Sequence, residues 1–254
     1  MGVDGGLFGP GTVTWRVGRE GVLLVAGGRA LLMQVAHPLV AAGVVQHSSF
    51  ERNPWRRLYR TLDLATCIVF GDSEQAGRAA DALRAVHARV HGTAPDGRPY
   101  RALDPDLLLW VWATLVDSAL LAYTRCVGAL TPDERERYYR EQTRFAAACG
   151  VPEGHWPPTY AAFAAYVEAT IGDACVVGDD ARRIARSVVR PAYAPVNLLT
   201  VGLLPATLRD RYGFGWGPGR ERALRAALRV ARAARAALPP RVREFPRAYA
   251  ATRR

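Results

Sequence analysis

The chain has 254 residues, half of them hydrophobic, and a formal net charge of +11. Alanine and leucine dominate its apolar residues, which favours helices, and the length allows a large core. Every basic residue is an arginine, which excludes a phosphate-binding loop ending in Gly-Lys. The arginines are interspersed with acidic residues, so we expect a solvated surface and no nucleic-acid partner.

The four cysteines lie far apart and form no Cys-x-x-Cys pair. This spacing excludes a zinc finger and favours free thiols in a reducing compartment. The start of the chain is neither basic nor followed by an uninterrupted apolar segment, which predicts no signal peptide. We therefore expect a cytoplasmic protein.

The first two helices are expected at Trp15–Ala26 and Ala30–Val45, the second interrupted or kinked near His37-Pro38 because proline cannot continue the hydrogen-bond ladder. The most apolar stretch of the chain, Gly21–Val45, contains Gly27-Gly28, Arg29 and this proline. A membrane-spanning helix needs about 20 apolar residues without such interruptions. We expect no transmembrane segment.

A third helix should begin at Asn53-Pro54, a capping residue followed by proline, and end near Phe70 before a glycine. The next begins at Asp72 or Ser73 and is expected to reach His91-Gly92. The polar segment Thr93–Ala102 contains Pro-Asp-Gly-Arg-Pro, which predicts a turn.

Asp104-Pro105 starts a very apolar helix, Leu107–Cys126, that we place in the core. Thr131-Pro-Asp-Glu supplies the cap and the acidic first turn of a helix that reaches Cys149-Gly150. No segment alternates in the manner of a strand. The sequence predicts an all-α fold with a single domain over 1–254. The remaining helices are expected from Pro157-Pro158 to Ile171 and at 179–190, 195–212 and Gly219–Leu238, the last basic and amphipathic.

Two histidines, His87 and His91, are one helical turn apart if the helix continues to Gly92. At 100° per residue the apolar positions of this helix form one stripe, with His87 near its middle and His91 and Arg84 on its flank. A neutral imidazole in an apolar wall suits a haem iron or another metal, but many buried histidines only hydrogen-bond to a carbonyl. Both interpretations stay open on periodicity alone. The stripe consists of Ala76, Ala79, Ala80, Leu83, Val86 and Val90.

On the helix that follows Asn53-Pro54, Arg57, Thr61 and Leu64 share one face, and Arg60 lies beside them. Two guanidinium groups and a hydroxyl can bind a carboxylate, a haem propionate or a bound oxygen species, or they can simply be solvated.

Two more histidines precede this helix. His37 lies in apolar sequence, which favours a buried, hydrogen-bonded imidazole over a metal ligand. His47 is expected to cap or line the entrance to a pocket. Carboxylates are scarce in the interior helices, which argues against a ferritin-like di-metal site. Asp117, one of the exceptions, is expected to hydrogen-bond a neighbouring helix or to orient a ligating histidine.

The order and spacing of several motifs resemble the oxygenase family that includes the bacterial latex clearing proteins, or rubber oxygenases, and the fungal MpaB oxygenase. The resemblance covers most of the chain. Its landmarks are Trp15-Arg-Val-Gly-Arg-Glu20, Leu31-Leu-Met-Gln-Val-Ala-His37-Pro38, Gln46-His47-Ser48-Ser49-Phe50, Arg57-Leu-Tyr-Arg60-Thr61, Phe70-Gly71, Arg84-Ala-Val-His87-Ala-Arg-Val, Asp96-Gly-Arg-Pro-Tyr100, Leu109-Trp-Val-Trp-Ala-Thr-Leu-Val-Asp-Ser118, Leu204-Pro205, Leu208-Arg209 and Tyr212-Gly213.

The resemblance implies an all-α fold around a globin-like helical core, with additional helices, that holds a non-covalent haem b. It implies that His87, in the Arg-x-x-His run, is the iron ligand, with His91 as the fallback. The family's distal Arg-x-x-Lys-Thr run falls on Arg57, Arg60 and Thr61. Arg60 replaces the lysine, and because a guanidinium stays protonated we expect an open distal site or a water there.

The resemblance also implies a distal glutamate as base, for which this sequence has no clear counterpart; His47 is the substitute that we consider. We expect a haem-dependent oxygenase that uses O2 on a hydrophobic, alkene-containing molecule. The alternatives are a haem protein of another kind, such as a sensor, carrier or peroxidase-like protein, and a helical scaffold without cofactor. Oligomerisation stays open. The candidate catalytic residues are Arg57, Thr61, Arg60 and His47, and the candidate cofactor-binding residues are His87, Arg84, His91 and His37.

Overall fold

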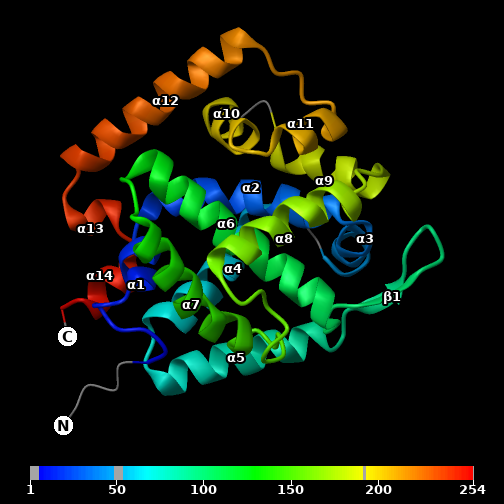
Figure 1. The fold of residues 1–254 in the computed structure, drawn as a ribbon, viewed down its shortest axis with the longest axis horizontal. Helices are drawn as coiled ribbons and strands as arrows, with labels where there is room; N and C mark the ends of the chain where they lie inside the picture. The colour runs from blue at the N-terminus through cyan, green and yellow to red at the C-terminus, as the bar shows by residue number, and fades with distance from the viewer. Residues whose placement is uncertain (1–5, 49–53, 191–192, 254) are drawn as a thin grey trace.

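The computed structural model describes residues 6–48, 54–190 and 193–253, with side chains from residue 61 onward in the second range. In this part of the chain helices dominate, and the all-α prediction is confirmed (Figure 1). The helices are α1 (Val13–Gly18), the 3-10 helix η1 (Gly21–Leu23), α2 (Leu24–Ala36), α3 (Pro38–His47), α4 (Pro54–Phe70), α5 (Ser73–His87), α6 (Pro105–Cys126), α7 (Pro132–Ala148), α8 (Tyr160–Asp173), α9 (Asp179–Val188), α10 (Ala194–Gly202), α11 (Ala206–Tyr212), α12 (Pro218–Ala237), α13 (Pro240–Arg243) and α14 (Pro246–Ala251).

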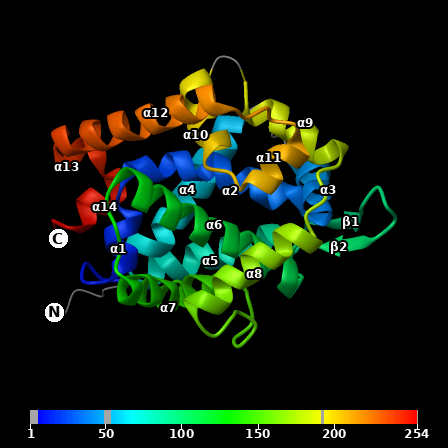
Figure 2. The same ribbon diagram turned by 45° about the horizontal axis from the view of Figure 1, so that its top comes forward.

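Helix α6 forms the centre of the molecule, with α2, α7, α8 and α12 packed around it (Figures 1 and 2). Its start is fixed as predicted, because the Asp104 side chain accepts a hydrogen bond from the amide of Asp106 and Pro105 occupies the first helical position. Among the described residues, α6 is the one unbroken helix long and apolar enough to cross a membrane. Of the most apolar stretch of α6, 67% is buried inside the protein, so α6 is a core helix here.

The predicted interruption near His37-Pro38 is confirmed. Helices α2 and α3 meet there at an angle of 109°, and His37 adopts an extended backbone conformation between them. The predicted boundary between residues 26 and 30 is wrong, because α2 runs without a break through Gly27-Gly28. The chain turns earlier instead, at Arg19 and Glu20, before η1.

A close approach between two helices explains why α2 contains Gly28. A Cβ atom at this position would lie 2.8 Å from Oγ1 and 3.0 Å from Cγ2 of Thr200, which belongs to α10. Thr200 is itself buried. The glycine is therefore a helix–helix contact site rather than a helix end.

We expect Gly28→Ala to destabilise the protein by about 1–3 kcal/mol, because the added methyl group overpacks this contact. The free energy of unfolding in urea measures the loss. Thr200→Ser removes Cγ2 and lets the hydroxyl rotate, so the double variant should recover most of the loss. If Gly28→Ala alone is as stable as the wild type, the contact does not restrict this position.

Several predicted element boundaries need correction. The expected helix to His91-Gly92 ends at His87, and the segment read as a loop contains a short antiparallel hairpin of β1 (His91–Thr93) and β2 (Pro99–Arg101) around the predicted turn. Strands of three residues are too short to show alternation. The helix expected at 195–212 is divided at Pro205 into α10 and α11, and α13 and α14 were not predicted.

Helix α12 packs along one edge of the molecule beside α10 (Figure 2). Its apolar side chains Leu224 and Leu228 are buried, and near its end Arg235 donates two hydrogen bonds, of 3.0 and 2.6 Å, to the carboxylate of Glu20. Glu20 is 1% exposed, so this pair neutralises a carboxylate that is shielded from water. Just beyond α13, the amide of Phe245 donates to the carbonyl of Arg19 at 2.9 Å. The basic, amphipathic helix α12 therefore packs on the body of the protein.

A buried arginine on α2 joins three parts of the core. The Arg29 guanidinium donates to the Ser118 hydroxyl at 2.6 Å, contacts the Asp117 carboxylate at 2.7 Å and reaches the carbonyl of Leu203 at 2.7 Å. Arg29 is 4% exposed. The predicted hydrogen bond of Asp117 to a neighbouring helix is confirmed, and its partner is this arginine.

Candidate functional site

Four of the five histidines belong to one end of the fold, formed by α3, the β1–β2 hairpin and the end of α5, which we name the histidine end (Figures 1 and 2). His37 precedes α3 and His47 ends it, whereas His87 ends α5 and His91 begins β1. A tight turn joins α5 to the hairpin, and in this turn the amide of Val90 donates to the carbonyl of His87 at 3.0 Å. The fold thus gathers predicted site residues that are 50 positions apart in the chain.

Side-chain hydrogen bonds fix the end of α3 to the hairpin. The Nε2 atom of His47 lies 3.0 Å from the carbonyl oxygen of His91, and the Gln46 amide donates to the carbonyl of Thr93 at 2.9 Å. The Tyr100 hydroxyl donates to Gln46 Oε1 at 2.6 Å. His47 is exposed, and its ring lies edge-on to that of Tyr100. The contact orients the imidazole: Nε2 faces an acceptor and carries the hydrogen, so Nδ1 is the basic nitrogen of the neutral ring.

Gly92 permits this close packing. A Cβ atom there would lie 2.7 Å from Gln46 Oε1 and 2.9 Å from the Tyr100 hydroxyl. Below it, a small apolar cluster of Ala42, Ala94, Tyr100 and Leu107 connects α3 and the hairpin to the start of α6. The hairpin is therefore a packed part of the histidine end.

His37 lies at the bend between α2 and α3 and is partly buried. Its Nδ1 atom is shielded from solvent and has no hydrogen-bond partner among the described residues. The predicted hydrogen bond is thus not seen at this nitrogen. Burial lowers the pKa of His37, the charge of Arg98 lowers it further, and Asp104 acts in the opposite direction. A neutral imidazole with a shielded nitrogen is chemically able to bind a metal.

His87 is the last residue of α5 and is half-buried, with its Nδ1 atom shielded from solvent. The predicted apolar stripe is only partly correct, because Ala76 and Ala80 are buried but Val86 is 44% exposed. Since the helix ends here, His91 does not lie one turn further along it; it is an exposed strand residue. Of the two, His87 has the more protected imidazole.

Arg84 connects α5 to α7. Its Nη1 atom donates to the carbonyl of Ala148 at 3.0 Å, at the end of α7, and the same side chain pairs with Asp81 one turn earlier. A cation at the end of a helix is favourable for the helix dipole. The structure thus gives Arg84 a packing contact, and a role toward a cofactor stays a prediction.

The predicted distal residues lie on α4, which packs against α5. The side chains of Arg57 and Arg60 lie outside the described residues, so their contacts stay predictions. Thr61 is exposed, and Leu64, one turn later, packs against the main core. On the predicted face of α4, Thr61 therefore lies at the surface, and Leu64 contacts the core.

The donor groups of the histidine end are compatible with a haem iron. A haem iron takes one or two axial ligands from the protein, and histidine is a common one. His37 and His87 each have an imidazole Nδ1 atom that is shielded from solvent. The described part of the chain holds no cluster of three or more His, Cys, Asp or Glu side chains of the kind a structural zinc needs. The residues present fit an iron held by one histidine.

A small pocket occurs elsewhere, between α9 and the residues that follow α11, and none of the predicted site residues lines it. The buried contacts of Arg29 were not predicted, because in the sequence this residue stands out only as an interruption of an apolar segment. An arginine in a helix without any acidic residue was the available signal, because such a charge needs a partner from another element when it is buried.

The described part of the chain is thus a helical protein in which four histidines lie on neighbouring elements at one end. The chain belongs to the family described as ER-bound oxygenase mpaB/B'/Rubber oxygenase, catalytic domain, whose sequence model matches residues 15–233. The resemblance stated from the sequence motifs is confirmed. Membership of an oxygenase family supports a general oxygenase role, with a substrate and O2 as the reactants.

Two mycobacterial proteins are similar to this chain. Uncharacterized protein Rv2237 of Mycobacterium tuberculosis and uncharacterized protein Mb2261 of Mycobacterium bovis are each 27% identical to it over 225 residues, which cover 83% of this chain and 88% of each relative. No solved structure matches this chain significantly. The globin-like core therefore stays an expectation from the family.

Proposed function

We propose that this protein is a haem-b-dependent oxygenase that acts on a hydrophobic, alkene-containing small molecule, such as an isoprenoid or polyketide chain. The match to the oxygenase family over residues 15–233 carries the proposal. That family includes rubber oxygenases, and rubber is a hydrocarbon chain with a double bond in each repeat. The apolar, all-helical body is compatible with such a substrate.

The residues of the histidine end would share the work of holding the cofactor. His87 would bind the iron, and Arg84, His91 and His37 would line the cofactor. The sequence has no Cys-x-x-Cys-His motif, so attachment would be non-covalent. When bound, the haem supplies the redox chemistry with O2, while the protein supplies binding, orientation and polarity.

The remaining candidates would act on the opposite side of the site. Arg57 and Thr61 would orient a propionate, O2 or substrate through charge-assisted and neutral hydrogen bonds. Arg60 would hold a fixed positive charge, because a guanidinium does not release its proton at physiological pH. His47 would act as acid or base at Nδ1, since its Nε2 atom faces the carbonyl of His91 at 3.0 Å.

We propose a cytoplasmic protein of one domain over residues 1–254 whose reactants are a hydrophobic small molecule and O2. The number of subunits is left open.

An absorption spectrum of the purified protein, with and without added haemin, tests this function. We expect a Soret band that shifts on reduction with dithionite and again on addition of carbon monoxide. O2 consumption with an alkene would then separate an oxygenase from a haem sensor, carrier or peroxidase-like protein. A colourless protein that takes up no haemin on reconstitution would contradict the proposal and favour a scaffold without cofactor.

A further inference from the structure

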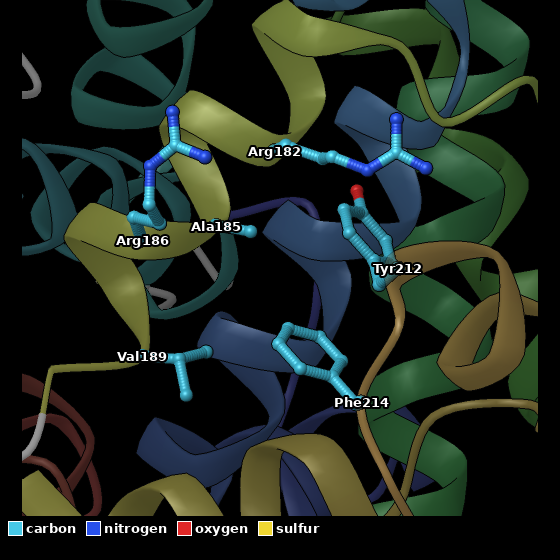
Figure 3. Close-up of a pocket in the computed structure, with 6 residues that line it drawn as sticks. All are labelled: Arg182, Ala185, Arg186, Val189, Tyr212 and Phe214. Carbon is cyan, nitrogen blue, oxygen red and sulfur yellow. The ribbon is translucent and has the colours of Figure 1, made fainter.

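A pocket of about 150 Å³ opens between α9 and the chain around the end of α11 (Figure 3). Helix α9 contributes one side of it, and Tyr212 and Phe214 contribute the other. The pocket belongs to none of the elements that form the histidine end, although α9 also packs on α2 and α3. Its lining residues are Arg182, Ala185, Arg186, Val189, Tyr212 and Phe214.

One part of the pocket is apolar and rigid. The rings of Tyr212 and Phe214 stack with their centroids 5.3 Å apart and their planes at 21°. The Tyr212 hydroxyl donates to the carbonyl of Leu32 at 2.7 Å, and burial raises the pKa of this tyrosine, so its ring is fixed and neutral. Val189 faces Phe214 across the opening (Figure 3). A volume of about 150 Å³ is large enough for a benzene ring.

The other part of the pocket carries two guanidinium groups from adjacent turns of α9 (Figure 3). Arg182 is held in place, because it donates to the carbonyls of Val177 at 2.7 Å and Arg211 at 3.1 Å. Arg186 makes no hydrogen bond or ion pair within the part of the chain that the structure describes, and no carboxylate lines the pocket. The pocket therefore has the fixed positive charge of Arg182 and the unpartnered positive charge of Arg186 beside its apolar side.

We propose that this pocket binds a small organic carboxylate whose apolar part is about the size of one aromatic ring. The ring would occupy the space between Val189 and Phe214, and the carboxylate would accept hydrogen bonds from Arg186. A guanidinium pairs well with a carboxylate because its donors match the two oxygens. An inorganic anion would use the charge but leave the apolar wall exposed to water.

Ligand-observed NMR titration with benzoate, on the protein as purified, tests the chemical class. We expect benzoate to bind with a dissociation constant of about 1 mM or tighter, as suits a ligand of so few atoms. Benzamide, which has the same ring without the charge, should bind about tenfold more weakly, and phosphate at about 10 mM should not displace benzoate. Absence of benzoate binding, or equal binding of benzamide, would overturn the proposal.

Variants locate the site. Arg186→Gln should weaken benzoate binding about tenfold, and Val189→Phe should abolish it by filling the pocket. Arg222→Gln on the exposed face of α12 removes the same charge outside the pocket and should leave the affinity unchanged. If Arg186→Gln and Arg222→Gln bind benzoate equally well, the ligand lies elsewhere. Since no candidate iron ligand lines the pocket, the same affinities are expected with and without haem.

Discussion

Replacement of His87 by alanine is expected to abolish stable haem binding, with loss of the Soret band after purification and after reconstitution with haemin. In the proposed function the imidazole of His87 would bind the iron, and alanine offers the iron no lone pair. His87 ends α5, where it is half-buried and its Nδ1 atom is shielded. The helix itself should survive, because alanine is a strong helix former.

Other histidine variants separate a lost ligand from a damaged fold. His91→Ala and His37→Ala should retain the haem band, and His87→Gly should recover it when free imidazole is added as a replacement ligand. If His87→Ala keeps a full haem complement with an unchanged spectrum, the assignment is wrong. Loss of the band in His37→Ala alone would transfer the ligand role to the bend between α2 and α3.

Arg29→Ala is expected to produce the largest loss of stability, about 2–4 kcal/mol, because it removes a buried cation that hydrogen-bonds to the Ser118 hydroxyl and pairs with the partly exposed Asp117 carboxylate. The variant leaves the Asp117 carboxylate, the Ser118 hydroxyl and the carbonyl of Leu203 without the donor that each now contacts. A cavity remains as well. Urea unfolding followed by far-UV circular dichroism measures the difference.

An exposed arginine provides the matched control. Arg222→Ala on α12 removes the same side chain from the surface and should change the free energy of unfolding by less than about 0.5 kcal/mol. The double variant Arg29→Ala/Asp117→Ala should lose less than the sum of the two single losses, because the two side chains interact directly. A loss below about 1 kcal/mol for Arg29→Ala would contradict the role given to the cluster.

Helix starts were the most predictable part of this fold. Asp104-Pro105, Asp72 and Thr131 all cap helices as expected, since a capping side chain and a proline act within one turn and need no distant partner. Gly27-Gly28 misled the prediction because its role depends on Thr200, which lies far along the chain. A glycine marks a helix end and a close helix contact equally well.

The candidate site was predictable only in part. The sequence singled out His37, His47 and His87 as candidates, and the fold brings their elements together at one end, while their roles stay predictions. The contact of His47 with the hairpin could not be foreseen, because β1 and β2 are three residues long and arise from packing against α3. Arg29 was missed because its partner Asp117 lies far along the chain, beyond the whole of α3, α4 and α5.

The pairing of Glu20 with Arg235 has a consequence during synthesis. These residues are 215 positions apart, and Glu20 leaves the ribosome first. At about 5–20 residues per second, its carboxylate waits roughly 10–40 s for its partner. Until then the α1–α2 junction must keep this charge hydrated, so the region cannot close around it. The part of the interior around Glu20 is therefore completed only after α12 has emerged from the ribosome.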